Sequence, residues 1–168
     1  MKRIVDLGKE EKRLSKESRN LLAKIRAAAK EEPGDLAMAT ETLESLRQQT
    51  YEDINQIQHE AIILRAVESL QKGDFTGRDI EWHWNPRQTG TADEPDLRGI
   101  FAGHTVLSAE ITSSPDPKGG LDSRMRDTLE KLSAMEGKKV FFVRTASMLR
   151  RAKTKVSKAR YQVEVRLI

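Results

Sequence analysis

The chain has 168 residues, of which 37% are hydrophobic and 33% are charged, a balance typical of one globular domain with some additional helix. It contains no cysteine, which excludes disulfides, zinc–cysteine sites and thiol catalysis and leaves carboxylates and three histidines as candidate metal ligands. No stretch approaches the roughly 18 apolar residues of a membrane span, and Met1-Lys2-Arg3 leads into charged sequence, so no signal peptide is expected. We therefore expect a cytoplasmic protein with no membrane association.

The formal net charge of +4 is unevenly distributed along the chain. Residues 1–72 hold 13 basic and 13 acidic side chains, whereas residues 138–163 hold nine basic side chains and no acidic one. A basic run of this kind is ordinarily a solvated helix face, and it favours nucleic-acid binding only when a site that acts on phosphate lies nearby. The C-terminal segment is thus predicted to be cationic, with both interpretations open.

The N-terminal part of the sequence predicts a helical hairpin. Apolar residues recur at helical spacing over residues 9–30, Pro33-Gly34 breaks the pattern, and Asp35 can cap a second helix that runs to Lys72-Gly73. A helix of that length spans about 50 Å, more than the usual width of such a domain. We expect residues 1–50 to form a hairpin or arm that projects or pairs with a second subunit, and residues 51–168 to form the main domain.

After Gly73 the residues alternate in the manner of strands. The predicted order is a helix, a three-stranded antiparallel meander, a helix, a strand, a helix and a strand, which is an α/β fold. Gly103-His104 is predicted to form a type II′ turn between the second and third strands. The expected ranges are strands 79–86, 95–103 and 104–112, helix 121–135, strand 138–145, helix 146–160 and strand 161–168.

Two acids occupy this meander where apolar residues would be expected. Asp96 stands seven residues before the turn and Glu110 six residues after it, so an antiparallel hairpin makes them near neighbours. Two adjacent carboxylates repel each other and raise each other's pKa unless a cation lies between them. Mg²⁺ or Mn²⁺, held by one or two carboxylates together with water and phosphate, resolves that conflict.

The residues around these acids resemble a known nuclease motif. Pro95-Asp96, followed after 13 residues by Glu110-Ile111-Thr112, resembles the PD-(D/E)xK superfamily, whose restriction-endonuclease-like core has the element order predicted above. The resemblance covers roughly residues 53–143. It implies that Asp96, Glu110 and the Ile111 carbonyl hold the metal ion, that Glu60 of the preceding helix acts directly or through water, and that the chain hydrolyses phosphodiester bonds of DNA.

One position departs from the motif, because the family's lysine is replaced by Thr112. Threonine can donate a hydrogen bond but carries no charge. Another cation has to substitute, or the site is impaired. Lys118, in the loop after the strand, is the first candidate, and Arg124 and Lys131 on the following helix are the others. The residues proposed for catalysis are Glu60, Asp96, Glu110, Thr112 and Lys118.

Basic residues near this site are candidates for binding the nucleic-acid backbone. They lie on the two helices that follow the hairpin, where surface ion pairs are the alternative role. His59, next to Glu60, is expected to lie on another face of its helix, either solvated or packed. The candidate nucleic-acid-binding residues are Arg124, Arg126, Arg150, Arg151, Lys153 and Lys155.

Three functions remain open from the sequence. The first is a Mg²⁺-dependent DNA endonuclease, expected to be a homodimer through its N-terminal helices because two sites allow both strands of a duplex to be cut. The second is a catalytically impaired protein with the nuclease fold that binds nucleic acid or a partner protein. The third makes the helical hairpin an oligomerisation module, with the α/β domain as its scaffold.

Overall fold

The computed structural model describes residues 1–30, 32–88, 91, 93–116 and 120–168. Within these residues the chain forms four α-helices, a 3₁₀ turn and one six-stranded mixed sheet, so the predicted α/β class is confirmed. In chain order the elements are β1 (Lys2–Arg3), α1 (Leu7–Ala28), α2 (Leu36–Lys72), β2 (Glu81–Trp84), the 3₁₀ turn η1 (Pro86–Gln88), β3 (Leu97–Phe101), β4 (His104–Ile111), α3 (Gly120–Ser133), β5 (Lys138–Val143), α4 (Ala146–Ala159) and β6 (Glu164–Leu167).

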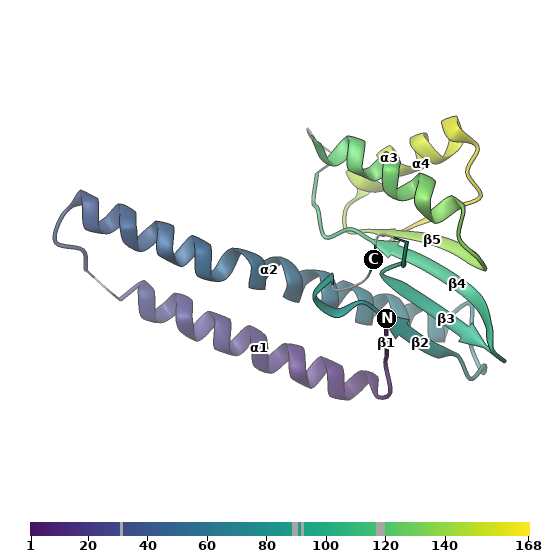
Figure 1. The fold of residues 1–168 in the computed structure, drawn as a ribbon, viewed down its shortest axis with the longest axis horizontal. Helices are drawn as coiled ribbons and strands as arrows, with labels where there is room; N and C mark the ends of the chain where they lie inside the picture. The colour runs from purple at the N-terminus through teal and green to yellow at the C-terminus, as the bar shows by residue number, and fades with distance from the viewer. Residues whose placement is uncertain (31, 89–90, 92, 117–119) are drawn as a thin grey trace.

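The two N-terminal helices form the predicted hairpin and extend well beyond the sheet (Figure 1). The Asp35 carboxylate caps α2 by accepting a hydrogen bond from the Met38 amide at 2.9 Å, and the helix ends at Gly73. Its 37 residues correspond to about 55 Å of helix. The start and end expected for α2 are therefore confirmed.

α2 has an exposed half and a buried half. Among its described residues none before Thr50 is buried, whereas the segment from Thr50 to Leu70 contributes ten buried side chains. The expected boundary between an arm and a main domain at residue 50 thus falls inside one continuous helix. No helix in the described part of the chain combines the length and apolar composition that crossing a membrane requires.

The strands are arranged in chain order across one sheet, β1-β2-β3-β4-β5-β6. Neighbours from β1 to β4 are antiparallel, and β4, β5 and β6 are mutually parallel. The expected meander corresponds to β2–β4, but the sheet as a whole is mixed. The sequence analysis did not predict β1, whose Lys2 is aligned with Trp84 of β2.

The turn between β3 and β4 is displaced by one residue from the expected position. Phe101 is aligned with His104, so the two central residues are Ala102 and Gly103, with φ angles of 49° and 81°. Positive φ at both central positions is the signature of a type I′ turn. The predicted type II′ turn over Gly103-His104 is wrong, because His104 already belongs to the ladder.

Helices cover the sheet on both faces, and the strand alternation separates two apolar clusters. Val140 and Phe142 of β5 face α2, whereas Phe141 and Val143 face α3 and α4. Trp82 and Trp84, which alternate on β2, are buried in the α2 cluster. The largest fully buried side chains of the α2 cluster are Trp84, Phe142, Ile63, Leu70, Leu97 and Leu107.

Candidate active site

Asp96 lies immediately before β3, where its carboxylate continues the ladder to β4. Its Oδ2 atom accepts a hydrogen bond from the Ile111 amide at 2.8 Å, in place of a backbone carbonyl. The buried Asn85 fixes the backbone around Asp96: its side-chain Nδ2 donates to the Pro95 carbonyl at 3.0 Å, and its amide donates to the Asp96 carbonyl at 3.2 Å. Asn85 is therefore a positioning residue that the sequence analysis missed.

Glu110 lies on β4 beside Asp96 and is 6% exposed. It is aligned with Phe141, whose side chain belongs to the α3–α4 cluster, so its carboxylate faces α3. Burial and the charge of Asp96 outweigh the attraction of Lys131 and raise the pKa of Glu110 to about 8. The structure thus places the two acids together, and Glu110 resists ionisation.

Lys131 of α3 supplies positive charge at this position. Its Nζ atom lies 2.5 Å from Oε1 of Glu110 and donates to the Glu94 carbonyl at 3.3 Å. The contact with Glu110 has ion-pair distance, although Oε1 accepts no well-aligned hydrogen bond from a described residue. Lys131 was one of the weaker sequence candidates for the missing motif lysine, whereas Lys118, the first candidate, lies outside the described residues.

His59 approaches the acid pair from α2. The ring is 3% exposed, and its Nε2 atom lies 3.3 Å from Oδ2 of Asp96. Burial lowers the pKa of His59. The net shift of this pKa is nevertheless upward, because His59 forms a hydrogen bond with Asp96, lies near the charge of Asp96 and has a hydrogen bond to the Ile111 backbone. Of the two roles expected for this histidine, the packed one is observed, but its contact with Asp96 was not foreseen.

Thr112 and Arg124 lie at the mouth of the site. Thr112 follows β4, its amide donates to the Phe142 carbonyl at 3.0 Å, and its Oγ1 accepts from the Ser114 amide at 3.3 Å. Arg124 of α3 is exposed and has no ion-pair partner among the described residues. A pocket of about 240 Å³ is lined by Glu110, Ile111, Thr112, Arg124, Met125, Thr128, Phe141 and Met148.

Glu60 has a different environment from the acid pair. It is 1% exposed, its Oε2 atom lies 2.5 Å from Nη2 of Arg13 in α1, and its Oε1 accepts from the Arg87 amide at 2.9 Å. Arg87 has a left-handed backbone, with φ of 53°, and its guanidinium pairs with Asp53 and Glu17. These contacts connect α1 and η1 to α2, and none of them involves Asp96 or Glu110.

The candidate nucleic-acid-binding residues fall into two groups. Arg151 and Lys155 of α4 pair with Asp122 at 2.7 and 3.0 Å, and Arg126 pairs with Asp127 at 3.3 Å. Arg150 and Lys153 are exposed and, like Arg124, form no ion pair with a described residue. The second group has charge available for another molecule, whereas the first is partly neutralised.

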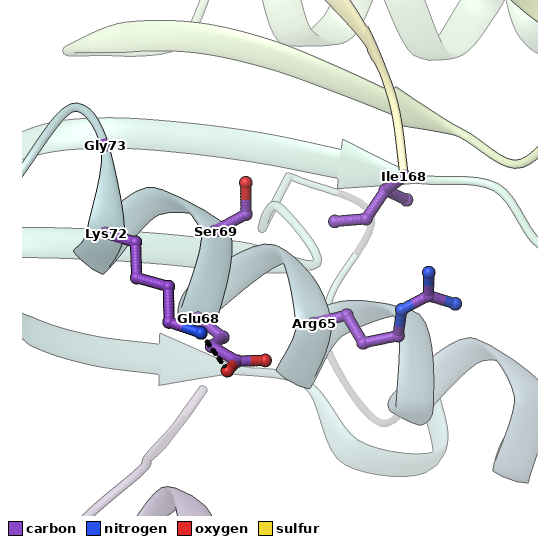
Figure 2. A pocket seen from close by; sticks show the side chains of 6 residues that line it. All are labelled: Arg65, Glu68, Ser69, Lys72, Gly73 and Ile168. Atoms are coloured by element: carbon purple, nitrogen blue, oxygen red, sulfur yellow. Dashed lines mark hydrogen bonds and ion pairs between the residues drawn. The ribbon is translucent and has the colours of Figure 1, made fainter.

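A larger pocket, of about 480 Å³, lies away from these acids at the end of α2 (Figure 2). Its one carboxylate side chain, Glu68, lies 2.5 Å from the Lys72 ammonium. The side chains that line the pocket therefore include no pair of acids, and their one carboxylate is already paired. The lining residues are Arg65, Glu68, Ser69, Lys72, Gly73 and Ile168.

Comparison with known proteins does not assign this site. No protein-family model, curated protein or solved structure matches the chain. Within the described residues, no group of three or more histidine or acidic side chains is arranged to hold a metal ion.

Proposed function

We propose that this chain is a cytoplasmic metal-dependent nuclease that hydrolyses phosphodiester bonds of DNA, and a divergent member of the PD-(D/E)xK superfamily. One observation carries the proposal. The buried Glu110 faces a second carboxylate, Asp96, beside a pocket, and its pKa is raised to about 8. A buried carboxylate beside a second carboxylate is costly to ionise, and such pairs are concentrated at sites that bind cations or transfer protons.

The donor set fits a hard divalent ion. Asp96 and Glu110 provide carboxylate oxygens, and Mg²⁺ is typically held by one or two carboxylates together with substrate phosphate. The Ile111 amide points at Asp96, and because the N–H and C=O of a strand residue share one edge, the Ile111 carbonyl is directed to the same side. Asp96, Glu110 and this carbonyl would hold Mg²⁺ or Mn²⁺, with the His59 imidazole beside them.

A bound ion would supply charge stabilisation at phosphate oxygens and lower the pKa of a coordinated water. The protein side chains contribute the remaining parts. Lys131 places an ammonium group next to Glu110, where it can neutralise and orient a phosphate. The Thr112 hydroxyl can donate a hydrogen bond, and Arg124 brings a second positive charge to the pocket. His59 holds the Asp96 carboxylate in place from the opposite helix.

The exposed basic side chains support DNA as the substrate. Arg150 and Lys153 of α4 carry unpaired charge, and contacts of this kind bind the phosphate backbone without reading base sequence. We expect binding that depends strongly on salt and weakly on sequence.

The second candidate is the impaired nuclease fold that binds nucleic acid or a partner protein. The ion pair of Lys131 with Glu110 favours it, because a lysine held by a ligand carboxylate is less available to a phosphate. Thr112 favours it also, because it brings no charge to the motif position.

Cleavage of labelled single-stranded, duplex and branched DNA, with an RNA control and with Mg²⁺ or Mn²⁺, separates the two candidates. We expect cleavage by the native chain and a loss of at least about 1,000-fold in Asp96→Asn and in Glu110→Gln. Glu130→Gln, an exposed acid on α3, is the matched control and should retain activity. Salt-sensitive binding without cleavage of any substrate would refute the nuclease and favour the impaired descendant.

A further inference from the structure

The half of the helical hairpin that extends beyond the sheet has an uncovered apolar stripe. Leu36, Leu43 and Tyr51 of α2 are 83%, 67% and 62% exposed. Because an α-helix turns by about 100° per residue, these three side chains lie within about 80° of one another on one face. Leu36 and Leu43 lie on the side of α2 that also carries Thr50 and Ile57, at steps of seven residues, and Ile57 meets α1. Because Leu36 and Leu43 are nevertheless largely exposed, α1 leaves this end of the stripe uncovered.

The surface beside the stripe is hollowed. A depression of about 350 Å³ surrounds Tyr51 on α2, and it is bordered by side chains of both charges. A side chain from another molecule can enter such a depression. Its lining residues are Glu44, Arg47, Gln48, Tyr51 and Glu52.

The two helices of this arm carry opposite charges. Residues 19–30 contain four basic and no acidic side chains, and residues 35–46 contain three acidic and no basic side chains. None of these seven groups forms an ion pair with another described residue. One arm thus presents a basic helix and an acidic helix whose charges are both available to another molecule.

We propose that a second copy of this chain docks on the arm, with α1 of each copy lying along α2 of its partner. Such a two-fold contact is self-complementary, so the basic segment 19–30 meets the acidic segment 35–46 twice. It also removes the exposed stripe of Leu36, Leu43 and Tyr51 from water, which is favourable in proportion to the apolar area buried.

The same observations disfavour other occupants. The acidic segment 35–46 repels a phosphate backbone, and a partner protein of one dominant charge complements only one of the two helices. A second copy complements both. The inference does not depend on the nuclease activity, although a dimer would bring two copies of the Asp96–Glu110 site into one assembly.

The mass of the full chain in solution tests the proposal. In sedimentation equilibrium between about 1 and 100 µM, we expect the native protein to approach twice the chain mass of 19.0 kDa. Leu43→Glu should raise the dissociation constant at least about tenfold, which corresponds to about 1.4 kcal/mol. Val5→Glu is the matched control, because Val5 is 88% exposed and lies outside the helices. A native monomer over this range, or a dimer unaffected by Leu43→Glu, would overturn the proposal.

A charge exchange tests the arrangement of the two helices. The double variant Glu41→Lys/Glu44→Lys makes both helices of an arm basic. The double variant Lys24→Glu/Arg26→Glu reduces the basic charge of α1 and adds acidic charge to this helix. Each double variant alone should be monomeric, whereas an equimolar mixture of the two should recover the mass of a dimer. Circular dichroism confirms that each variant keeps its helical content. Failure of the mixture to associate would overturn the pairing of α1 with α2 of the partner.

Discussion

Two buried glutamates of this chain, Glu60 and Glu110, have opposite surroundings. Glu60 receives the Arg13 guanidinium at 2.5 Å and the Arg87 amide at 2.9 Å. Glu110 faces Asp96, and although Lys131 lies 2.5 Å away, its pKa is raised to about 8. A buried acid that accepts hydrogen bonds from its neighbours, as Glu60 does, connects elements of the fold. A buried acid held against a second acid lowers stability, and sites of that kind are where function is expected.

Among the partners of these two glutamates, the lysine that approaches Glu110 should give the largest effect. In Lys131→Met we expect cleavage to fall about 100-fold or more, because one cation that neutralises the phosphate is lost, while the fold is retained. Lys118→Met, assayed alongside, tests the first candidate from the sequence. Single-turnover cleavage at saturating Mn²⁺ gives the comparison. Full activity in Lys131→Met would remove this residue from the site.

The corresponding change beside Glu60 should affect stability and leave the chemistry intact. Arg13→Met leaves the buried Glu60 carboxylate without its main partner, and we expect a loss of about 3 kcal/mol in the free energy of unfolding. Urea unfolding measures this loss, and cleavage per folded molecule should stay within about twofold. A selective loss of activity in a fully folded Arg13→Met protein would instead give Glu60 the catalytic role expected from the sequence.

The raised pKa of Glu110 also predicts how stability depends on pH. Between pH 4.5 and about 8 the unfolded chain loses this proton while the folded chain keeps it, so rising pH favours unfolding. In EDTA we expect the unfolding free energy to fall over that range by up to about 5 kcal/mol, and Glu110→Gln to remove most of the fall. Urea unfolding across the range provides the test. An equal decline in both proteins would show that another group is responsible.

The smallest effects concern DNA binding by α4. Arg150→Ala should reduce the slope of log K against log salt by about 0.9, the value for one phosphate contact. Arg151→Ala should change it less, because Arg151 already pairs with Asp122 at 2.7 Å. Fluorescence anisotropy with duplex DNA at several salt concentrations measures both slopes. Equal slopes for the two variants would contradict the division between free and paired arginines.

The sequence predicted those parts of the fold that depend on local patterns. Apolar spacing and the cap residues Asp35 and Gly73 placed α2 correctly, and strand alternation located β2 to β6 to within a few residues. The turn was displaced because Ala102 adopts a positive φ, which its residue type does not favour. β1 was missed because a two-residue edge strand has no period of its own.

The site was predictable only in part, because its contacts cross the sheet. The hairpin pattern was enough to bring Asp96 and Glu110 together. His59 reaches Asp96 from α2, 37 positions away in the chain, and Lys131 reaches Glu110 from α3, so neither contact has a local signal. Glu60 was expected at the site, but Arg13 and Arg87 hold it in a separate cluster.

The measurement that tests the central claim most directly is a Mn²⁺ titration of thermal unfolding, with the native protein beside Glu110→Gln. The account predicts that the ion raises the Tm of the native protein, because it binds only the folded acid pair, and leaves the Tm of Glu110→Gln almost unchanged. No shift in the native protein, or the same shift in both proteins, would show that the Asp96–Glu110 pair does not hold a divalent cation.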